Sequence, residues 1–198
     1  LLTLFLCFGC SDKPAAKSEV IQSQHAIVNG EKETDYPAIG AMTVQVGDFY
    51  SGSFCTGTLI TPTWVVTAAH CIDGGYNRMN GREGAPDETF FHFYVGHRAD
   101  REGSGVMYRA ARVVVHPGWT ERGGRQFYDI ALMELQEPVQ DVDPYPMFTG
   151  DLTQYEGEQL LYAGFGVSDG AEGTGGGTKR SKMLTLRRVY SSSFSTVQ

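Results

Sequence analysis

Residues 64–71, Trp-Val-Val-Thr-Ala-Ala-His-Cys, constrain the fold of this chain more than any other stretch. The residues Trp64–Thr67 are aromatic or β-branched, which favours a buried strand. Two alanines follow, and their small side chains allow another backbone or a substrate to approach closely. We expect His70 to stand at the end of this strand and face a cleft, with Cys71 able to tie that end to a neighbouring strand. Taken alone, such a pair is better interpreted as a core histidine beside a buried cysteine, so its meaning depends on the rest of the chain.

The composition indicates one all-β domain. The chain has 198 residues, of which 25 are glycine and 12% are aromatic, and this length suits a single globular domain. Long helical periodicities are few, which is typical of an all-β protein with many turns. The 16 basic and 23 acidic residues give a net charge of −7, and no basic patch is present, so a nucleic-acid partner is not expected.

Strand-like segments recur roughly every ten residues with turn residues between them, which predicts a sandwich or a barrel. Between them, Asp73–Glu88 is predicted to form a surface loop. Glu137–Gly150, with three prolines, is predicted to connect two halves. Gly170–Gly177 is glycine-rich but precedes no helix-length segment, so no nucleotide cofactor is expected. The predicted strands are Met42–Val46, Phe54–Ile60, Trp64–Thr67, Phe91–Val95, Arg109–His116, Ile130–Leu135, Gln159–Val167 and Leu184–Val189.

The first ten residues, LLTLFLCFGC, form an apolar run that is too short to span a bilayer as a helix and suits a secretory signal. Gly9 followed by Cys10 resembles the signal of bacterial lipoproteins, in which the cysteine carries the lipid, and an ordinary cleaved signal is the alternative. Residues 11–26 are polar and are predicted to be a tether or propeptide. We expect an exported protein that is extracellular, periplasmic or anchored to a bacterial envelope, with membrane attachment only through a lipid on Cys10.

Asp129 stands immediately before the apolar run Ile130–Leu135. If its carboxylate lies beside His70, it can accept a hydrogen bond from one ring nitrogen and fix the tautomer of the imidazole. It would also stabilise the imidazolium that forms when the other nitrogen takes a proton. Because a serine hydroxyl needs such an oriented base to become a nucleophile, the two residues are candidates for a catalytic pair.

Five segments stand out along the chain, Ile27–Gly30, Cys55–Ile60, Trp64–Cys71, Val115–Pro117 and Asp129–Leu132. Their order is typical of the trypsin/chymotrypsin family, which this chain resembles from Ile27 to Gln198. The Thr-Ala-Ala-His-Cys and Asp-Ile-Ala-Leu motifs are highly specific together, and Gly164-Phe165-Gly166 is similar to the family's usual Gly-Trp-Gly.

The resemblance implies an all-β fold of two packed antiparallel β-barrels with the catalytic cleft between them, the second barrel being incomplete in this chain. It implies that His70 is the general base, that Asp129 orients it, and that Cys55 and Cys71 form a disulfide. It also implies that Ile27 becomes the amino terminus after processing. Protein or peptide substrates and proteinaceous inhibitors are the expected partners, and no cofactor is expected.

The chain departs from the family pattern in three ways. The nucleophile motif Gly-Asp-Ser-Gly-Gly is absent from the 198 residues, and Ala26 stands before Ile27 where relatives carry a basic residue. Gly96–Asp100 lacks the acidic start of the calcium loop found in some relatives, so no metal is expected. We interpret residues 27–198 as a serine endopeptidase domain truncated on its C-terminal side, which carries His and Asp but not Ser and is inactive as it stands. The alternatives are a non-catalytic binding module on the protease fold and a structural surface lipoprotein.

Overall fold

The structure is a computed structural model, and it describes residues 27, 29–79, 90–101, 104–123, 125–169, 172, 174–190 and 194–197. The predicted signal segment, the predicted lipid site at Cys10 and the predicted tether at residues 11–26 lie outside the described residues. In the part of the chain that the structure describes, no helix is long and apolar enough to cross a membrane.

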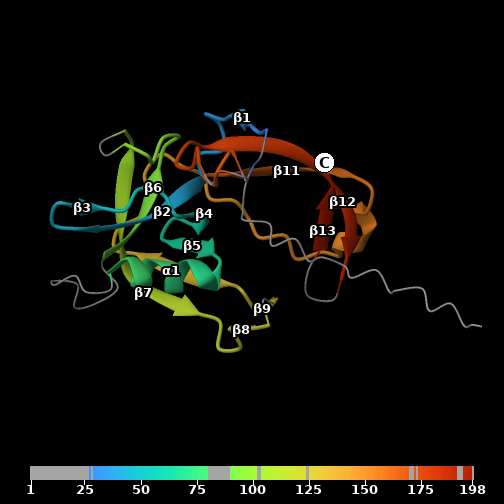
Figure 1. The fold of residues 1–198 in the computed structure, drawn as a ribbon, viewed down its shortest axis with the longest axis horizontal. Helices are drawn as coiled ribbons and strands as arrows, with labels where there is room; N and C mark the ends of the chain where they lie inside the picture. The colour runs from blue at the N-terminus through green and yellow to red at the C-terminus, as the bar shows by residue number, and fades with distance from the viewer. Residues whose placement is uncertain are drawn as a thin grey trace, which may run out of the picture.

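Six antiparallel strands close into a β-barrel (Figure 1). Their order around the barrel is β2, β4, β5, β10, β7 and β6, and β6 pairs back to β2. Because each strand pairs on both sides, the barrel has no long open edge. Short strands β3 (Phe49–Tyr50), β8 (Thr120–Arg122) and β9 (Arg125–Phe127) extend from it as hairpins. The barrel strands are β2 (Ile39–Val46), β4 (Cys55–Thr61), β5 (Trp64–Thr67), β6 (Phe91–Val95), β7 (Val106–Val115) and β10 (Ala131–Leu135).

Apolar side chains from all six strands fill the barrel. In β5 and β10, buried residues alternate with partly exposed ones, as expected for strands with one face in the core. Strand β2 differs, because Thr43 on its outer face is also fully buried. Ala41 on the same face belongs to a second apolar cluster with Tyr94, Ala99 and Phe165. Phe165 comes from the second part of the chain, so the barrel is covered on this side.

The remaining strands form a second, open antiparallel sheet (Figure 1). Its central strand is β12 (Arg180–Val189), which pairs along one edge with β11 (Gln159–Gly164). Along its other edge it pairs with β1 (Glu31–Lys32) near its start and with β13 (Phe194–Val197) near its end. A 3₁₀ turn, η2 (Leu152–Tyr155), precedes β11. The predicted all-β fold with two antiparallel parts is confirmed, and the second sheet does not close within the described residues.

The second sheet is fastened to the barrel next to Cys55. The Phe165 N–H donates to Thr56 Oγ1 at 3.0 Å. A Cβ at Gly164 would lie 2.8 Å from this oxygen, so a larger residue there would crowd the Thr56 side chain that accepts the hydrogen bond. The Phe165 ring meets the Tyr94 ring edge to face, with centroids 6.2 Å apart. The Gly-Phe-Gly segment therefore joins the two parts of the fold one residue away from Cys55.

One helix, α1 (Ala69–Met79), begins directly after β5 and corrects two expectations. His70 lies in the first turn of this helix and not at the end of the strand, and the residues from Asp73 to Met79 are helical where a surface loop was predicted. Gly75 permits close packing of this helix, because a Cβ there would lie 1.9 Å from an aromatic ring of β6. Contacts with the barrel therefore stabilise this helix more than its intrinsic helix propensity does.

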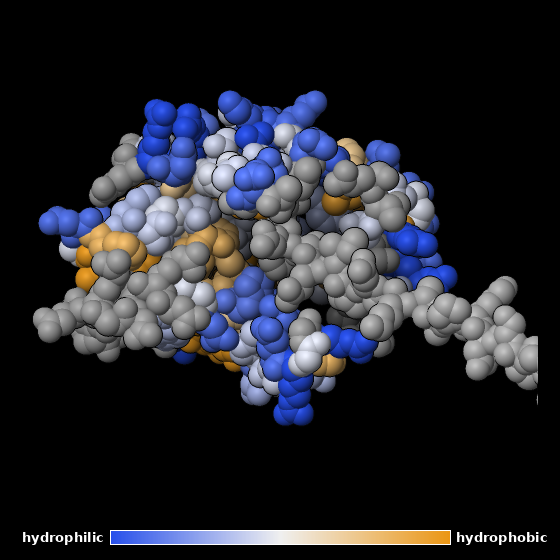
Figure 2. Space-filling view, in the orientation of Figure 1, coloured by the Kyte–Doolittle hydropathy of each residue, from blue (hydrophilic) through white to orange (hydrophobic). Residues whose placement is uncertain are grey.

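On the face drawn in Figure 2, hydrophilic side chains predominate along the top edge, and apolar side chains gather over the barrel. The open sheet carries exposed apolar side chains of its own. Leu161 of β11 and Met183 of β12 are cross-strand neighbours, and they are 40% and 47% exposed. The described residues therefore leave part of this sheet face uncovered.

Candidate active site

His70 and Asp129 are in direct contact, although they are 59 positions apart in the sequence. His70 Nδ1 lies 2.7 Å from Asp129 Oδ2, and the backbone N–H of His70 donates to Asp129 Oδ1 at 2.8 Å. Because an ionised carboxylate only accepts hydrogen bonds, Nδ1 carries the proton in this contact. In the neutral imidazole, the lone pair that can accept a proton is then on Nε2. The two side chains are 23% and 21% exposed, so the pair is partly buried and the imidazole remains accessible.

The same carboxylate caps helix α1. The first N–H groups of a helix have no acceptor within the helix, and a negative charge beside them is stabilising. The first turn of α1 contains no acidic residue, and Asp129 supplies the carboxylate from the segment before the neighbouring strand β10. One side chain thus fixes both the backbone and the ring of His70. Sequence reasoning anticipated the contact to the ring but missed the contact to the backbone.

The barrel register explains why these two residues meet. Strand β10 pairs antiparallel with β5, and Ala131 stands opposite Thr67. Continuing this register by two residues places Asp129 opposite Ala69, next to His70. The contact is therefore built by strand pairing in the barrel and not by a local turn.

A turn immediately before Asp129 has an uncommon backbone conformation. Tyr128 has a φ of 53°, a region that non-glycine residues seldom adopt and that costs energy. Its ring stacks on the His116 ring, with centroids 4.8 Å apart and planes 7° from parallel. The Gly118 N–H donates to His116 Nδ1 at 3.0 Å, and the Ile130 N–H donates to the Tyr128 carbonyl at 2.8 Å. These contacts hold the backbone on both sides of Asp129.

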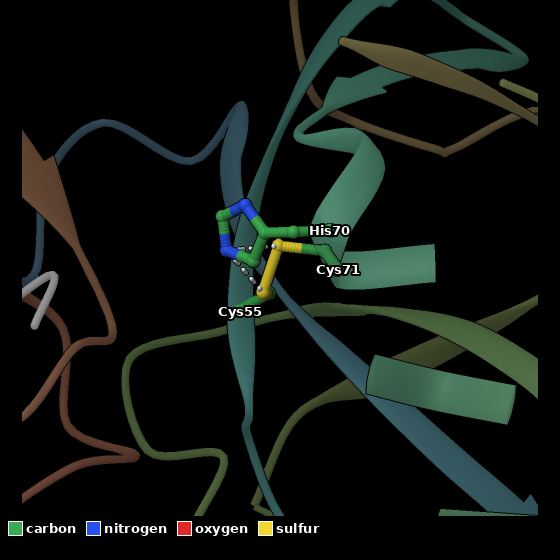
Figure 3. A group of neighbouring side chains, drawn as sticks. All are labelled: Cys55, His70 and Cys71. Atoms are coloured by element: carbon green, nitrogen blue, oxygen red, sulfur yellow. Dashed lines mark hydrogen bonds between the residues drawn. A yellow bond between two sulfur atoms is a disulfide. The ribbon is translucent and has the colours of Figure 1, made fainter. Parts of the chain in front are cut away.

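The predicted disulfide is confirmed. Cys55, the first residue of β4, is bonded to Cys71, and their Cα atoms are 6.0 Å apart. The bond joins residues 16 positions apart, and closing a loop of this size contributes about 3 kcal/mol in the chain-entropy description. Figure 3 shows both sulfurs beside the imidazole, with His70 Nε2 3.5 Å from Cys71 Sγ and 4.0 Å from Cys55 Sγ. The bridge anchors the first turn of α1 to the barrel where His70 projects.

The disulfide and His70 also form a cluster of metal-ligand type. One ligand atom from each of Cys55, His70 and Cys71 lies within 4.8 Å of the others. In the disulfide neither sulfur is a thiolate, which is the form that binds metals. The oxidised cluster therefore offers only the imidazole as a strong ligand.

Comparison with known proteins identifies the family. Residues 27–191 match the family described as Trypsin. The chain belongs to the trypsin family. It is 35% identical to a trypsin of Simulium vittatum over 85 residues, which cover 43% of this chain and 28% of that protein. A trypsin of Phaedon cochleariae is 33% identical over 118 residues, covering 58% of this chain and 41% of that protein. Chymotrypsin-like elastase family member 1 of Felis catus is 34% identical over 85 residues, covering 43% of this chain and 28% of that protein.

The chain thus spans less than half the length of these relatives. The family resemblance expected from the motifs is confirmed, and with it a fold of the serine protease type. The catalytic roles of His70 and Asp129 remain predictions. The processed amino terminus at Ile27 also remains a prediction, and in the structure the Ile27 carbonyl accepts a hydrogen bond from the Gly30 N–H at 3.1 Å.

The other histidines that the structure describes in this trypsin-family chain have different surroundings. His92 is 5% exposed, and its Nδ1 lies 3.0 Å from the Phe90 carbonyl. Burial lowers the pKa of His92, because the charged form would lose its water. His97 is exposed on the surface, and His116 belongs to the turn before Asp129. Of the histidines in the part of the chain that the structure describes, only His70 forms an ion pair with a carboxylate.

Sequence reasoning missed a buried cation in the second part of this trypsin-family chain. Lys179 is 1% exposed, and its Nζ donates to the carbonyls of Asp35 at 3.3 Å and Tyr36 at 3.0 Å. The ammonium also lies 5.7 Å from the centroid of the Phe165 ring. Burial lowers the pKa of Lys179 to about 8, although the nearby carboxylates Glu33 and Asp35 oppose the shift. Lys179 fastens the segment before β2 to the second part of the fold, and a lysine beside a glycine-rich stretch gave no signal of this.

Proposed function

We propose that the protein to which this chain belongs is a serine endopeptidase, with His70 as its general base and Asp129 as the partner that orients it. The observation that carries the proposal is the contact of one carboxylate with both the ring and the backbone of His70. A helix cap alone needs only an acceptor for the backbone N–H, and Ser, Thr or Asn would serve equally well. The additional contact to Nδ1 favours the tautomer that a general base requires.

In the proposed reaction, Nε2 of His70 takes the proton from a serine hydroxyl as the serine oxygen attacks the carbonyl carbon of a peptide bond. The resulting imidazolium is stabilised by Asp129, whose Oδ2 lies 2.7 Å from Nδ1. Nε2 then donates the proton to the leaving amine, and water hydrolyses the acyl-enzyme by the same route. The family motif that carries the serine, Gly-Asp-Ser-Gly-Gly, is absent from residues 1–198. We place this motif in sequence beyond Gln198, so that residues 27–198 alone are inactive.

The proposal includes export of the protein and action on proteins or peptides outside the cytoplasm, where proteinaceous inhibitors could bind the same site. The disulfide supports export, because disulfides persist in oxidising compartments. We place the mature amino terminus at Ile27 and a lipid on Cys10 of the precursor. Cleavage of the Ala26–Ile27 bond would then release the catalytic domain from the lipid. Intact-mass analysis of the mature protein tests this step, and a species with a lipidated Cys10 and an uncut Ala26–Ile27 bond would rule out release.

The decisive experiment uses the full coding sequence, expressed as the wild type and as His70→Ala and Asp129→Asn variants. Hydrolysis of a protein substrate and labelling by a fluorophosphonate serine probe are the two measurements. Asp129→Asn is expected to lower kcat about 10⁴-fold, the loss known for the corresponding change in a protease of this family. His97→Ala, which changes an exposed histidine, serves as the control. Near-normal turnover of Asp129→Asn would refute the assignment, and a full sequence without a serine motif would favour a non-catalytic binding module.

A further inference from the structure

The three side chains drawn in Figure 3 have nearly the geometry of a metal centre. A tetrahedral zinc ion with Zn–S bonds of about 2.3 Å and a Zn–N bond of about 2.0 Å holds its sulfur and nitrogen ligands about 3.5 Å apart. In the structure, His70 Nε2 lies 3.5 Å from Cys71 Sγ and 4.0 Å from Cys55 Sγ. Only the two sulfurs would have to move, from a bonded pair to about 3.8 Å apart across the ion.

The backbone allows this movement. The Cα atoms of Cys55 and Cys71 are 6.0 Å apart, so rotation of the two side chains can bring both sulfurs onto one ion while β4 and α1 stay in place. The hydrogen bonds of His70 to Asp129 hold the first turn of α1 independently of the disulfide. The site would therefore keep its shape after the sulfur–sulfur bond is broken.

The surroundings of His70 also suit a metal ligand. A histidine that binds a metal through one ring nitrogen commonly donates its other N–H to a carboxylate, which fixes the tautomer and raises the basicity of the ligand. Asp129 Oδ2 occupies this position, 2.7 Å from Nδ1. Nε2, the nitrogen that would bind the ion, is the one that lies beside both sulfurs.

We propose that reduction of the Cys55–Cys71 disulfide creates a Cys2His site for a divalent metal ion of the zinc class. A dithiol reductant supplies two electrons and two protons, so that the protein disulfide becomes two thiols and the reductant becomes a disulfide. The thiols release their protons to solvent as the thiolates bind the ion. Two sulfurs and Nε2 fill three positions of a tetrahedron, and water fills the fourth.

Metal binding at this site would prevent His70 from acting as the base of the His70–Asp129 pair. An Nε2 that is bonded to a metal ion has no lone pair with which to accept a proton, so the metal-bound form cannot use His70 as a base. Reduction in the presence of zinc would thus switch off the proposed peptidase, and oxidation would restore it. The metal site itself does not depend on the proposed function, because it needs only residues of the described chain.

The test uses the 198-residue chain with Cys7 and Cys10 changed to serine, so that other thiols do not bind the probe. The oxidised protein and the phosphine-reduced protein are each titrated anaerobically with Co²⁺ alone. Binding is measured by the thiolate-to-cobalt charge-transfer absorption, and Zn²⁺ is then added as a competitor. Matched variants are His70→Ala, Asp129→Asn and the control His97→Ala. Circular dichroism of every reduced sample shows whether the fold is retained.

We expect one equivalent of Co²⁺ to bind the reduced protein with a tetrahedral thiolate spectrum, and none to bind the oxidised protein. Asp129→Asn should weaken binding by about 10–100-fold, the usual effect of losing a carboxylate behind a histidine ligand. His70→Ala should weaken binding at least as much, and His97→Ala should leave it unchanged. An unfolded reduced chain that binds through its thiols alone would show no effect of His70→Ala. That result, or the absence of stoichiometric binding while both thiols are free, overturns the proposal whatever the peptidase assays give.

Discussion

Replacing Asp129 by alanine and by asparagine separates the two contacts that its carboxylate makes with His70. Alanine removes the acceptor of the backbone N–H and the acceptor of Nδ1–H together. Asparagine keeps one oxygen, which can still accept from the backbone N–H, and presents an NH₂ group to the ring. Nδ1 must then accept a hydrogen bond, so the proton of the neutral imidazole moves to Nε2.

The expected size of each effect follows from these contacts. Loss of a helix cap costs about 0.5–2 kcal/mol, and loss of a hydrogen bond to a charged group costs about 1.5–3 kcal/mol. The His70 and Asp129 side chains are 23% and 21% exposed, so water can reach the alanine variant and replace part of what is lost. We expect the free energy of unfolding to fall by about 2–3 kcal/mol for Asp129→Ala and by less than about 1 kcal/mol for Asp129→Asn.

Urea unfolding followed by tryptophan fluorescence measures both differences in stability, and ¹⁵N chemical shifts of the His70 ring report the tautomer. Asp143→Ala, a change of an exposed aspartate, is the control and should stay within about 0.5 kcal/mol of the wild type. If Asp129→Ala also stays within this range, the carboxylate does not cap α1. If Asp129→Asn retains the proton on Nδ1, then Asp129 does not determine the tautomer, and the proposed role of the pair fails with it.

Three other changes test the packing of the fold. Serine at both Cys55 and Cys71 should lower the free energy of unfolding by about 3 kcal/mol, and an unchanged urea midpoint would contradict the role given to the bridge. Gly75→Ala should cost about 1–3 kcal/mol through overpacking, because the new methyl group would lie 1.9 Å from an aromatic ring. Its control is Gly176→Ala, whose methyl group would have nothing nearer than 3.7 Å. For Lys179, the pKa is lowered from 10.5 to about 8 in the folded protein, so the unfolded chain binds more protons between these pH values and stability should rise with pH there. Urea unfolding at several pH values should therefore show that the free energy of unfolding of the wild type rises by on the order of 1–3 kcal/mol relative to Lys179→Met between about pH 8 and pH 10. Parallel pH profiles of the two proteins would show that the pKa of Lys179 is not shifted.

The sequence predicted the barrel strands well, because alternating apolar residues mark a strand whatever its partners are. It could not predict α1. A glycine pair in a polar stretch indicates a loop by its composition, and only the position of the β6 ring shows that Gly75 permits close packing of a helix. The burial of Lys179 is similar, because its carbonyl acceptors at residues 35 and 36 come from the other end of the chain.

The contact between His70 and Asp129 was predictable in part. The motifs indicated that the two residues belong together, and strand register explains how they meet. The hydrogen bond to the backbone N–H of His70 was not predictable, because it requires a helix to begin at Ala69. A strand ending at His70 would present the same ring without an uncapped N–H group. The missed helix and the missed hydrogen bond are therefore one error with one cause.

His70 is held by three covalent or hydrogen-bonded attachments, each from a different part of the barrel. Strand β5 leads into its turn, Asp129 binds it from the start of β10, and the bond from Cys71 to Cys55 ties the next residue to β4. A general base needs one orientation and one tautomer, and the attachments through β5 and the disulfide can supply only the orientation. Asp129 is the attachment that also selects the tautomer. Asp129→Asn keeps the shape of the side chain but presents a donor to Nδ1 in place of an acceptor, so it should impair proton transfer while leaving the fold nearly intact. Loss of the disulfide should instead lower stability while the hydrogen bonds to Asp129 keep the ring in place.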